Sequence, residues 1–240
     1  MDNQQYFLSI DNGTQSVRAM VFDAQGQLIA KSKIDIEPYF SDQPGWAEQH
    51  ADYFWDALCK ACQALWPLLP IPKESIAAVS VTTQRATAIA MGADNQPLRP
   101  AISWLDQRQV ETKPALGALE SALFTLVRAK PLVDLMHKQA EANWIAQNEP
   151  NIWDKVHKFV LLSGYHNYKL TGEYKDAIAS TVGFLPFDYK TQQWADKRDW
   201  KWRAMPITQE MLPEVLPAGA ELGRITLQAA TETGIPNGLP

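Results

Sequence analysis

The sequence is poor in cysteine and lacks long apolar segments. Its 240 residues include only two cysteines, Cys59 and Cys62, which are too few for a disulfide framework and favour a reducing cytoplasm. Charged residues or prolines interrupt every apolar stretch well before about 18 residues, so we expect no membrane-spanning helix. The polar start of the chain lacks the basic region of a signal peptide.

No sign of charge dominates the chain. The formal net charge is -5 without a long run of one sign, whereas proteins that bind a nucleic-acid backbone show a basic face, so nucleic acid is not an expected partner. The four histidines are scattered and show no metal-ligand spacing. Cys59 and Cys62 lie on the apolar side of a predicted helix, which favours core packing over a redox or metal pair.

The remaining pattern is that of a globular chain in which strands precede helices. The Asn-Gly pair at 12–13 predicts a hairpin between the first two strands. Predicted strands cover residues 6–10, 17–22, 28–36, 76–82, 86–91 and 101–104. Predicted helices cover residues 52–65, 114–127, 134–147, 150–156, 161–170, 176–181 and 194–202. This order predicts an α/β or α+β domain with a mixed sheet, and the antiparallel start argues against a pure Rossmann order.

The sharpest chemical motif is the octapeptide from Asp11 to Arg18. It predicts a tight turn whose backbone N–H groups can cradle a phosphate. The Asp11 carboxylate can hold a hydrated Mg²⁺, and the Arg18 guanidinium can neutralise phosphoryl oxygens. The same octapeptide equally fits a plain hairpin turn with a polar tip.

The segment from Ser9 to Arg18 resembles the first phosphate motif of the FGGY carbohydrate kinases, which belong to the sugar kinase, actin and Hsp70 superfamily. Further segments are similar to this family, in the same order and at suitable distances, and the resemblance covers about residues 5 to 240. These segments are 43–49 (QPGWAEQ), 83–85 (TQR), 101–108 (AISWLDQR), 168–173 (YKLTGE), and 212–223 with 233–240 before the inter-lobe hinge.

The resemblance implies a ribonuclease H-like fold of the actin, hexokinase and Hsp70 type. We therefore expect a mixed five-stranded sheet whose first three strands are antiparallel, with helices on both faces and a helical insertion over roughly 110–185. Residues 1–240 are then the N-terminal, sugar-binding domain, ending at the inter-lobe hinge. The family's catalytic base and its ATP-binding C-terminal domain fall beyond Pro240, so we expect little or no kinase activity from this chain alone.

The resemblance also implies a nucleotide site around the octapeptide. Asp11 matches the family's Mg²⁺-associated carboxylate, which acts through water. Gly13 and Thr14, with Gln15 and Ser16 beside them, match the turn that meets the transferable phosphate of ATP. Arg18 matches an arginine that contacts the phosphoryl group. The implied cofactors are ATP and Mg²⁺.

Five residues are the implied sugar contacts. Carboxylate, amide and guanidinium groups suit a polyhydroxylated substrate, because each satisfies hydroxyl groups. Glu48 fits a substrate contact and a helix N-terminal carboxylate equally well. Ala86 stands where glycerol kinases carry a glutamate that binds the substrate, which argues against glycerol. The five residues are Gln84, Arg85, Trp104, Asp106 and Glu48.

For the intact enzyme, these features imply transfer of the γ-phosphate of ATP to a hydroxyl of a small sugar, for which a ketopentose such as xylulose is our first choice. Glycerol or another polyol is the second, because Gln84 and Arg85 resemble the glycerol kinase branch. A non-catalytic single-lobe sugar-binding protein and an actin- or Hsp70-like nucleotide switch stay open as other classes. Expected partners are the sugar or polyol and ATP, with a homodimer left open.

Overall fold

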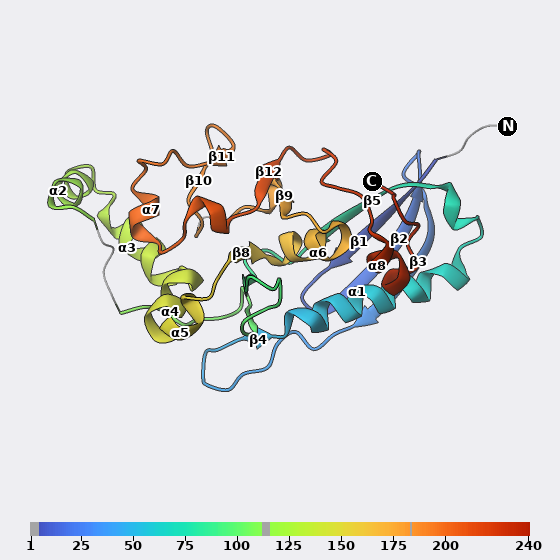
Figure 1. The fold of residues 1–240 in the computed structure, drawn as a ribbon, viewed down its shortest axis with the longest axis horizontal. Coiled ribbons are helices and arrows are strands. Elements are labelled where there is room, and N and C mark those ends of the chain that lie inside the picture. Colours follow the sequence, from blue (N-terminus) through green and yellow to red (C-terminus); the bar gives the residue numbers. More distant parts are fainter. Residues whose placement is uncertain (1–4, 112–115, 183) are drawn as a thin grey trace.

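The computed structural model describes residues 5–111, 116–182 and 184–240. Its larger sheet has four strands in the order β3-β2-β1-β5 (Figure 1). The three N-terminal strands pair antiparallel as predicted, and β5 runs parallel to β1. The strands are β1 (Tyr6–Asn12), β2 (Ser16–Asp23), β3 (Leu28–Asp35) and β5 (Ile76–Thr83).

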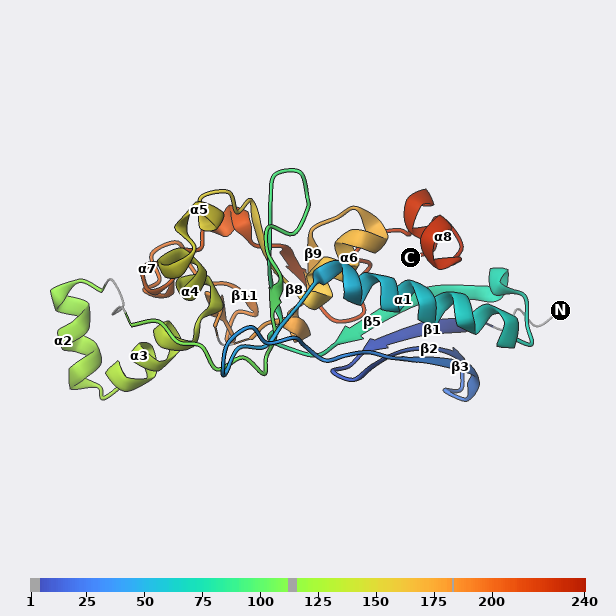
Figure 2. The same ribbon diagram turned by 90° about the horizontal axis from the view of Figure 1, so that it is seen from below.

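One face of this sheet forms the main core. Side chains alternate along β1, so Leu8 and Ile10 are fully buried while Phe7 on the opposite face is 39% exposed. Figure 2 shows α1 (Ala51–Leu65), α6 (Leu162–Thr171) and α8 (Leu227–Thr233) on one side of the sheet. The expected mixed α/β architecture is confirmed, while in the described residues this sheet has four strands rather than five, with these three helices on one face.

A second, smaller sheet carries the remaining predicted strands. Its order is β4 (Glu48–Gln49), β7 (Ala101–Ile102), β6 (Ala88–Met91) and β8 (Lys158–Leu161). Apolar side chains of this sheet and of the helices near it, including Phe159, Trp144 and Ile145, make a second hydrophobic cluster.

Short helices make up the expected helical insertion and lie beyond the smaller sheet in Figure 1. Ala140, in extended geometry, separates the third helix from the fourth, so the predicted helix over 134–147 is two helices. The first residues of the predicted helix over 114–127 lie outside the described residues. Within the insertion these helices are α2 (Ala118–Leu126), α3 (Lys130–Gln139), α4 (Glu141–Asn148) and α5 (Pro150–Trp153). The short helix α7 (Lys201–Ala204) comes after the expected end of the insertion.

Two predicted helices are wrong, because aspartate side chains there bond to nearby backbone and compete with helix formation. The segment 176–181 contains β9 (Lys175–Ala177) and a 3₁₀ turn (Ile178–Ser180), and β9 pairs with β12 (Glu214–Leu216). The segment 194–202 begins in β11 (Gln193–Trp194), which pairs with β10 (Phe187–Asp188).

The bonds that redirect these segments are local. The Asp176 carboxylate accepts the N–H of the next residue at 2.8 Å, while Asp196 and Asp199 each accept an N–H two residues on at 2.9 Å. None of the described helices is both long and apolar enough to cross a membrane.

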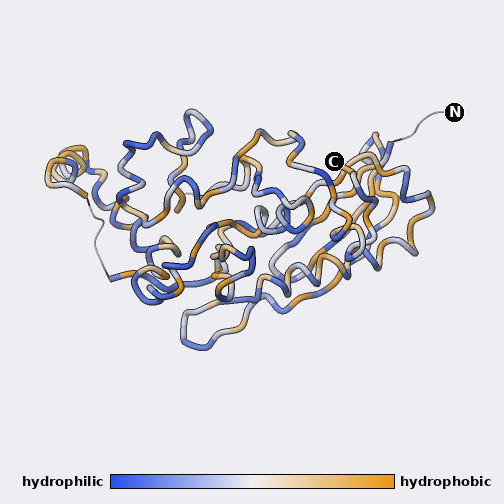
Figure 3. Tube along the Cα trace, in the orientation of Figure 1, coloured by the Kyte–Doolittle hydropathy of each residue, from blue (hydrophilic) through white to orange (hydrophobic). Residues whose placement is uncertain are grey.

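The colouring by hydropathy agrees with this division of the chain. In Figure 3 the strands of the larger sheet carry apolar stretches, while the outlying helices and loops mix apolar and polar residues. The candidate site lies between these two parts, where β1 and β5 end.

Candidate functional site

The site begins where β1 and β5 end at the same edge of the sheet. Because the two strands are parallel, their carboxyl ends lie together, and the N–H of Gln84 donates to the carbonyl of Asn12 at 2.8 Å. One residue before Asn12 in β1, Asp11 lies opposite Arg18 across the hairpin. Their side chains form an ion pair of 2.7 Å, with the carboxylate 28% and the guanidinium 38% exposed. A carboxylate and a cation are therefore both accessible at this edge.

The turn between β1 and β2 contains backbone N–H groups that are available to a ligand. The N–H of Gly13 closes the turn on the carbonyl of Ser16 at 3.0 Å. Within the described ranges, the N–H groups of Thr14 and Gln15 donate to no protein atom. Adjacent free amides in a turn form an anion-binding concavity, so this turn fits the phosphate groups of ATP.

Whether this site can hold Mg²⁺ depends on the carboxylate of Asp11. Among the residues the structure describes, no group of three or more histidine, cysteine or acidic side chains could hold a metal directly. Mg²⁺ keeps several of its waters and needs only one or two protein carboxylates. The accessible Asp11 carboxylate fits that water-mediated role, and Arg18 is its present ionic partner.

Trp104 connects the predicted sugar side of the site to the turn between β1 and β2. Its indole N–H donates to the hydroxyl of Thr14 at 3.2 Å, although the two residues are 90 positions apart. The Trp104 side chain is 50% exposed. An apolar ring face thus stands open beside the turn, as a sugar platform requires.

Gln84 and Arg85 follow β5 and lie next to the same turn. The side-chain nitrogen and oxygen of Gln84 are buried, and neither forms a hydrogen bond within the described part of the chain. Arg85 donates to the carbonyl of Thr181 at 2.6 Å. Ala86 has a φ of 55°, a left-handed conformation that strains any residue with a Cβ. Unpaired amide groups and local strain are typical of binding sites.

Glu48 and Asp106 lie instead in a buried network around Arg108. Asp106 accepts the N–H of Ala47 at 2.6 Å and the Arg108 side chain at 2.7 and 2.8 Å. Glu48 forms ion pairs with Arg108, at 2.8 Å, and with Arg99. The two carboxylates are only 7% and 3% exposed. They join the loop before β4 to the loop that carries Trp104.

Two tryptophans enclose this network. The guanidinium carbon of Arg108 lies 4.0 Å from the ring centre of Trp46 and 4.4 Å from that of Trp144. Such cation–π contacts strengthen when water is excluded. The structure therefore places Glu48 and Asp106 with Arg108, Asp11 with Arg18, and Thr14 with Trp104.

Glu141, at the start of α4, makes this region sensitive to pH. Burial raises its pKa from 4.5 to about 7; Asp106 nearby raises it further, while Arg108 lowers it. Because the folded-state pKa lies above the unfolded value, the contribution of Glu141 to stability is complete below pH 4.5 and is lost as the pH rises through about 7.

We expect Glu141→Gln to remove this loss. In denaturant unfolding, the free energy of unfolding of the original chain should fall relative to that of the variant by about 1–3 kcal/mol as the pH rises from 4.5 to about 7. Below the unfolded pKa the two curves should run parallel. A constant offset between them at every pH would contradict the expectation.

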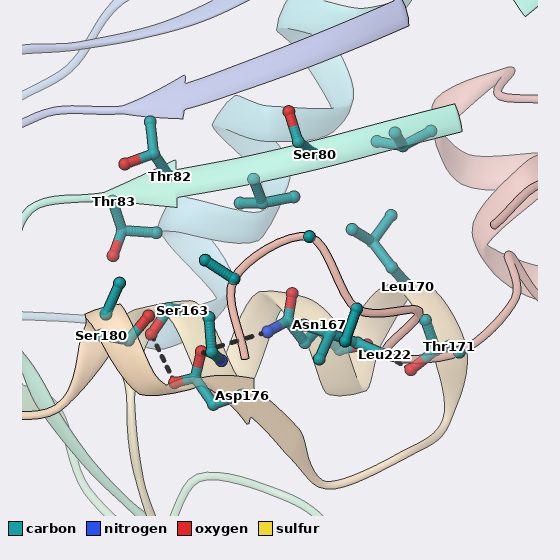
Figure 4. A pocket seen from close by; sticks show the side chains of 18 of the residues that line it. Ser80, Thr82, Thr83, Ser163, Asn167, Leu170, Thr171, Asp176, Ser180 and Leu222 are labelled. Atoms are coloured by element: carbon teal, nitrogen blue, oxygen red, sulfur yellow. Dashed lines mark hydrogen bonds between the residues drawn. The ribbon is translucent and has the colours of Figure 1, made fainter. Parts of the chain in front are cut away.

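A cavity of about 840 Å³ borders this site only in part. It follows β5 from Ala78 to Arg85, facing α6 and the loop of residues 217–223. Figure 4 shows Asp176 in its wall, accepting hydrogen bonds from Ser163 and Asn167. Burial raises the pKa of Asp176. Of the predicted site residues, only Gln84 and Arg85 line this cavity.

Sequence reasoning missed His166 and gave Asn12 no role of its own. Both are fully buried, and a ring nitrogen of His166 lies 2.8 Å from the Asn12 side-chain oxygen. Nothing local in the sequence connects positions 154 residues apart. Only the packing of α6 against the end of β1 brings them together.

Comparisons with known proteins identify the class. The model of the FGGY family of carbohydrate kinases, N-terminal domain, matches residues 6–240. The chain therefore belongs to the FGGY family of carbohydrate kinases. It is 30% identical over 227 residues to a glycerol kinase of Ectopseudomonas mendocina, covering 91% of this chain and 45% of that protein. It is 29% identical over 238 residues to an uncharacterized sugar kinase, YgcE, of Escherichia coli K12, covering 99% and 41%.

Solved structures show the same fold. The chain superposes on a xylulose kinase of Rhodospirillum rubrum with a TM-score of 0.79 at 22% identity, covering 99% of this chain and 48% of that one. It superposes on a glycerol kinase of Plasmodium falciparum, solved with ADP, with a TM-score of 0.73 at 22% identity, covering 98% and 48%. The chain thus spans less than half the length of the relatives it matches.

Proposed function

We propose that this chain is the sugar-binding lobe of an enzyme that transfers the γ-phosphate of ATP to a hydroxyl of a small sugar. The observation that carries the proposal is the Trp104–Thr14 hydrogen bond, which joins an open aromatic face to a turn with free amides. A sugar on that face and a phosphate on that turn would be neighbours. Neighbouring acceptor and donor groups are what phosphoryl transfer needs.

Each residue at the turn has a role in this proposal. The N–H groups of Thr14 and Gln15 hold phosphoryl oxygens, with Gly13 and Ser16 closing the turn around them. Arg18 neutralises phosphoryl charge. Asp11 orders the hydration waters of Mg²⁺. When bound, ATP supplies the transferable phosphoryl group and Mg²⁺ neutralises its negative charge.

For the substrate we propose a ketopentose such as xylulose. Arg85 and the unpaired amide of Gln84 offer donors and an acceptor for sugar hydroxyls. Ala86 offers no carboxylate at the position where glycerol kinases carry one. The names of the relatives support both a xylulose kinase and a glycerol kinase, so glycerol is the second candidate. Glu48 and Asp106 support the site by holding the Trp104 loop in place.

We further propose that residues 1–240 form one of two lobes and that ATP binding is completed by a second. The relatives are more than twice as long as this chain, which covers 45% and 41% of two of them. A base for the sugar hydroxyl then belongs to the other lobe. The two buried, unpaired thiols fit a reducing cytoplasm.

The test is a titration of this chain with xylulose, glycerol and MgATP, following the indole N–H resonance of Trp104. We expect xylulose to shift that resonance more than glycerol does, and the buried Trp144 indole serves as an internal control. Trp104→Phe identifies the signal, and Arg85→Ala should weaken the response by about tenfold or more, because it removes a charged hydrogen-bond donor.

Other outcomes separate the rival functions. A larger response to glycerol favours a polyol kinase. A response to MgATP with none to either sugar favours a nucleotide switch and contradicts the sugar-binding proposal. Turnover of ATP and xylulose by this chain alone, at ordinary kinase rates, would refute the two-lobe proposal.

A further inference from the structure

The imidazole of His166 lies in the main core behind the phosphate turn. His166 belongs to α6 and is fully buried. Its ring centre lies 6.2 Å from that of Trp55 and 5.9 Å from that of Tyr165. A buried, polar ring among aromatic side chains needs a hydrogen-bonding partner to offset its desolvation. Asn12, at the end of β1, supplies that partner.

The direction of this hydrogen bond follows from the amide of Asn12. The Asn12 side-chain nitrogen donates to the carbonyl of Gly13 at 3.1 Å, so its oxygen is left to accept. The Nε2 atom of His166, 2.8 Å from that oxygen, must then carry the proton. Nδ1 makes no hydrogen bond within the described residues. Burial lowers the pKa of His166 to about 3, so the ring is neutral and holds a single tautomer.

Asn12 is the residue through which several parts of the site connect. Its side chain holds the carbonyl of Gly13, and its own carbonyl accepts the N–H of Gln84. The next residues along the chain present the free amides of Thr14 and Gln15. Asn12 therefore contacts the phosphate turn through its side chain and Gln84, just after β5, through its backbone.

We propose that His166 is a positioning residue whose Nε2–H fixes Asn12 and thereby aims the amides of Thr14 and Gln15 at a bound phosphoryl group. It does not touch the reacting atoms, because it is fully buried behind the turn. The phosphoryl group as the target of the amides rests on the proposed function. The proposal that His166 holds the turn in one conformation does not depend on the proposed function.

Three variants separate this role from simple packing. His166→Gln places an amide N–H close to the position of Nε2, whereas His166→Asn carries the same amide but is one methylene too short. His166→Leu fills the site without any donor. We expect amide hydrogen exchange at Gly13 to be about tenfold faster with Asn or Leu and to return towards the original rate with Gln. Exchange in β3 serves as the internal control for overall stability.

The second measurement uses inorganic phosphate as the probe, followed through the amide resonances of Thr14 and Gln15. The affinity for phosphate should fall in His166→Asn and His166→Leu and recover in His166→Gln. If Gln and Asn behave alike, the proposal is overturned, since packing and polarity then explain the effect. If the original chain shows no phosphate response, the proposed function fails at this turn, while the Gly13 exchange rates still decide whether His166 positions it.

The original chain provides a test that requires no variant. Nitrogen-15 spectra of the His166 ring should show a slowly exchanging Nε2–H and a bare Nδ1. Finding the proton on Nδ1 would overturn the proposal even if every variant failed to fold.

Discussion

Replacing Arg108 with alanine is expected to lower the free energy of unfolding by about 3–5 kcal/mol. The guanidinium is 3% exposed and lies between the carboxylates of Asp106 and Glu48. The variant keeps the backbone N–H of residue 108 on Asp106 but loses every side-chain donor. A carboxylate left without its cation in a water-excluded site keeps its full desolvation cost, and that cost is the source of the loss.

The matched control is Lys33→Ala, which removes a cation from a solvent-exposed ion pair with Asp35. Exposed pairs contribute about 0–1 kcal/mol, so this variant should unfold almost as the original chain does. Arg108→Lys should fall between the two, because lysine keeps the charge but loses the planar fork and the stacking on Trp46. Urea unfolding of the three variants measures this order of stability. Equal stability of Arg108→Ala and Lys33→Ala would refute the assignment of a buried network.

The same variant also tests how the network serves the site. Arg108 joins the loop before β4 to the loop that carries Trp104, and Trp104 reaches Thr14. If Glu48 and Asp106 are supports rather than sugar contacts, Arg108→Ala should disturb the Trp104 indole resonance before any sugar is added. Arg108→Lys should disturb it less.

Local sequence patterns predicted the parts of the fold that depend on local forces. The three N-terminal strands and the helix over 52–65 are confirmed, because their apolar periodicity matches the face that each buries. β8 was missed where a helix was expected to begin at Leu161, since this strand exists by pairing with β6. α8 was missed inside a segment rich in proline and glycine, although Thr226 caps it by accepting the N–H of Ala229.

The candidate site divides in the same way. The turn at Gly13 was predicted from a short motif, and Asp11 and Arg18, which that motif singled out, pair across the same hairpin. The pairing of Glu48 with Arg108 and of Asn12 with His166 depends on side chains that meet only after packing. Motif reasoning can name such residues, but it cannot tell whether their lone pairs are free for a substrate.

Gly234→Ala is expected to be the most damaging single-methyl substitution in the C-terminal segment. Gly234 ends α8 with a φ of 76°, and a Cβ there would lie 2.5 Å from the Nε1 atom of Trp66. The left-handed conformation costs about 1–2 kcal/mol and the overpacking about 1–3 kcal/mol. Trp66 cannot retreat freely, because its Nε1–H donates to the carbonyl of Thr233 at 2.9 Å.

Gly26→Ala separates these two costs. Gly26 has nearly the same φ, 80°, but no atom lies within 4 Å of a Cβ placed there. When both variants are unfolded in urea, the free energy of unfolding of Gly26→Ala should therefore fall only by the conformational cost, about 1–2 kcal/mol. The excess loss at Gly234 measures how firmly α8 is held against the end of α1. Equal losses would mean that Trp66 moves aside at no cost and that the Trp66–Thr233 hydrogen bond contributes little to the docking of α8.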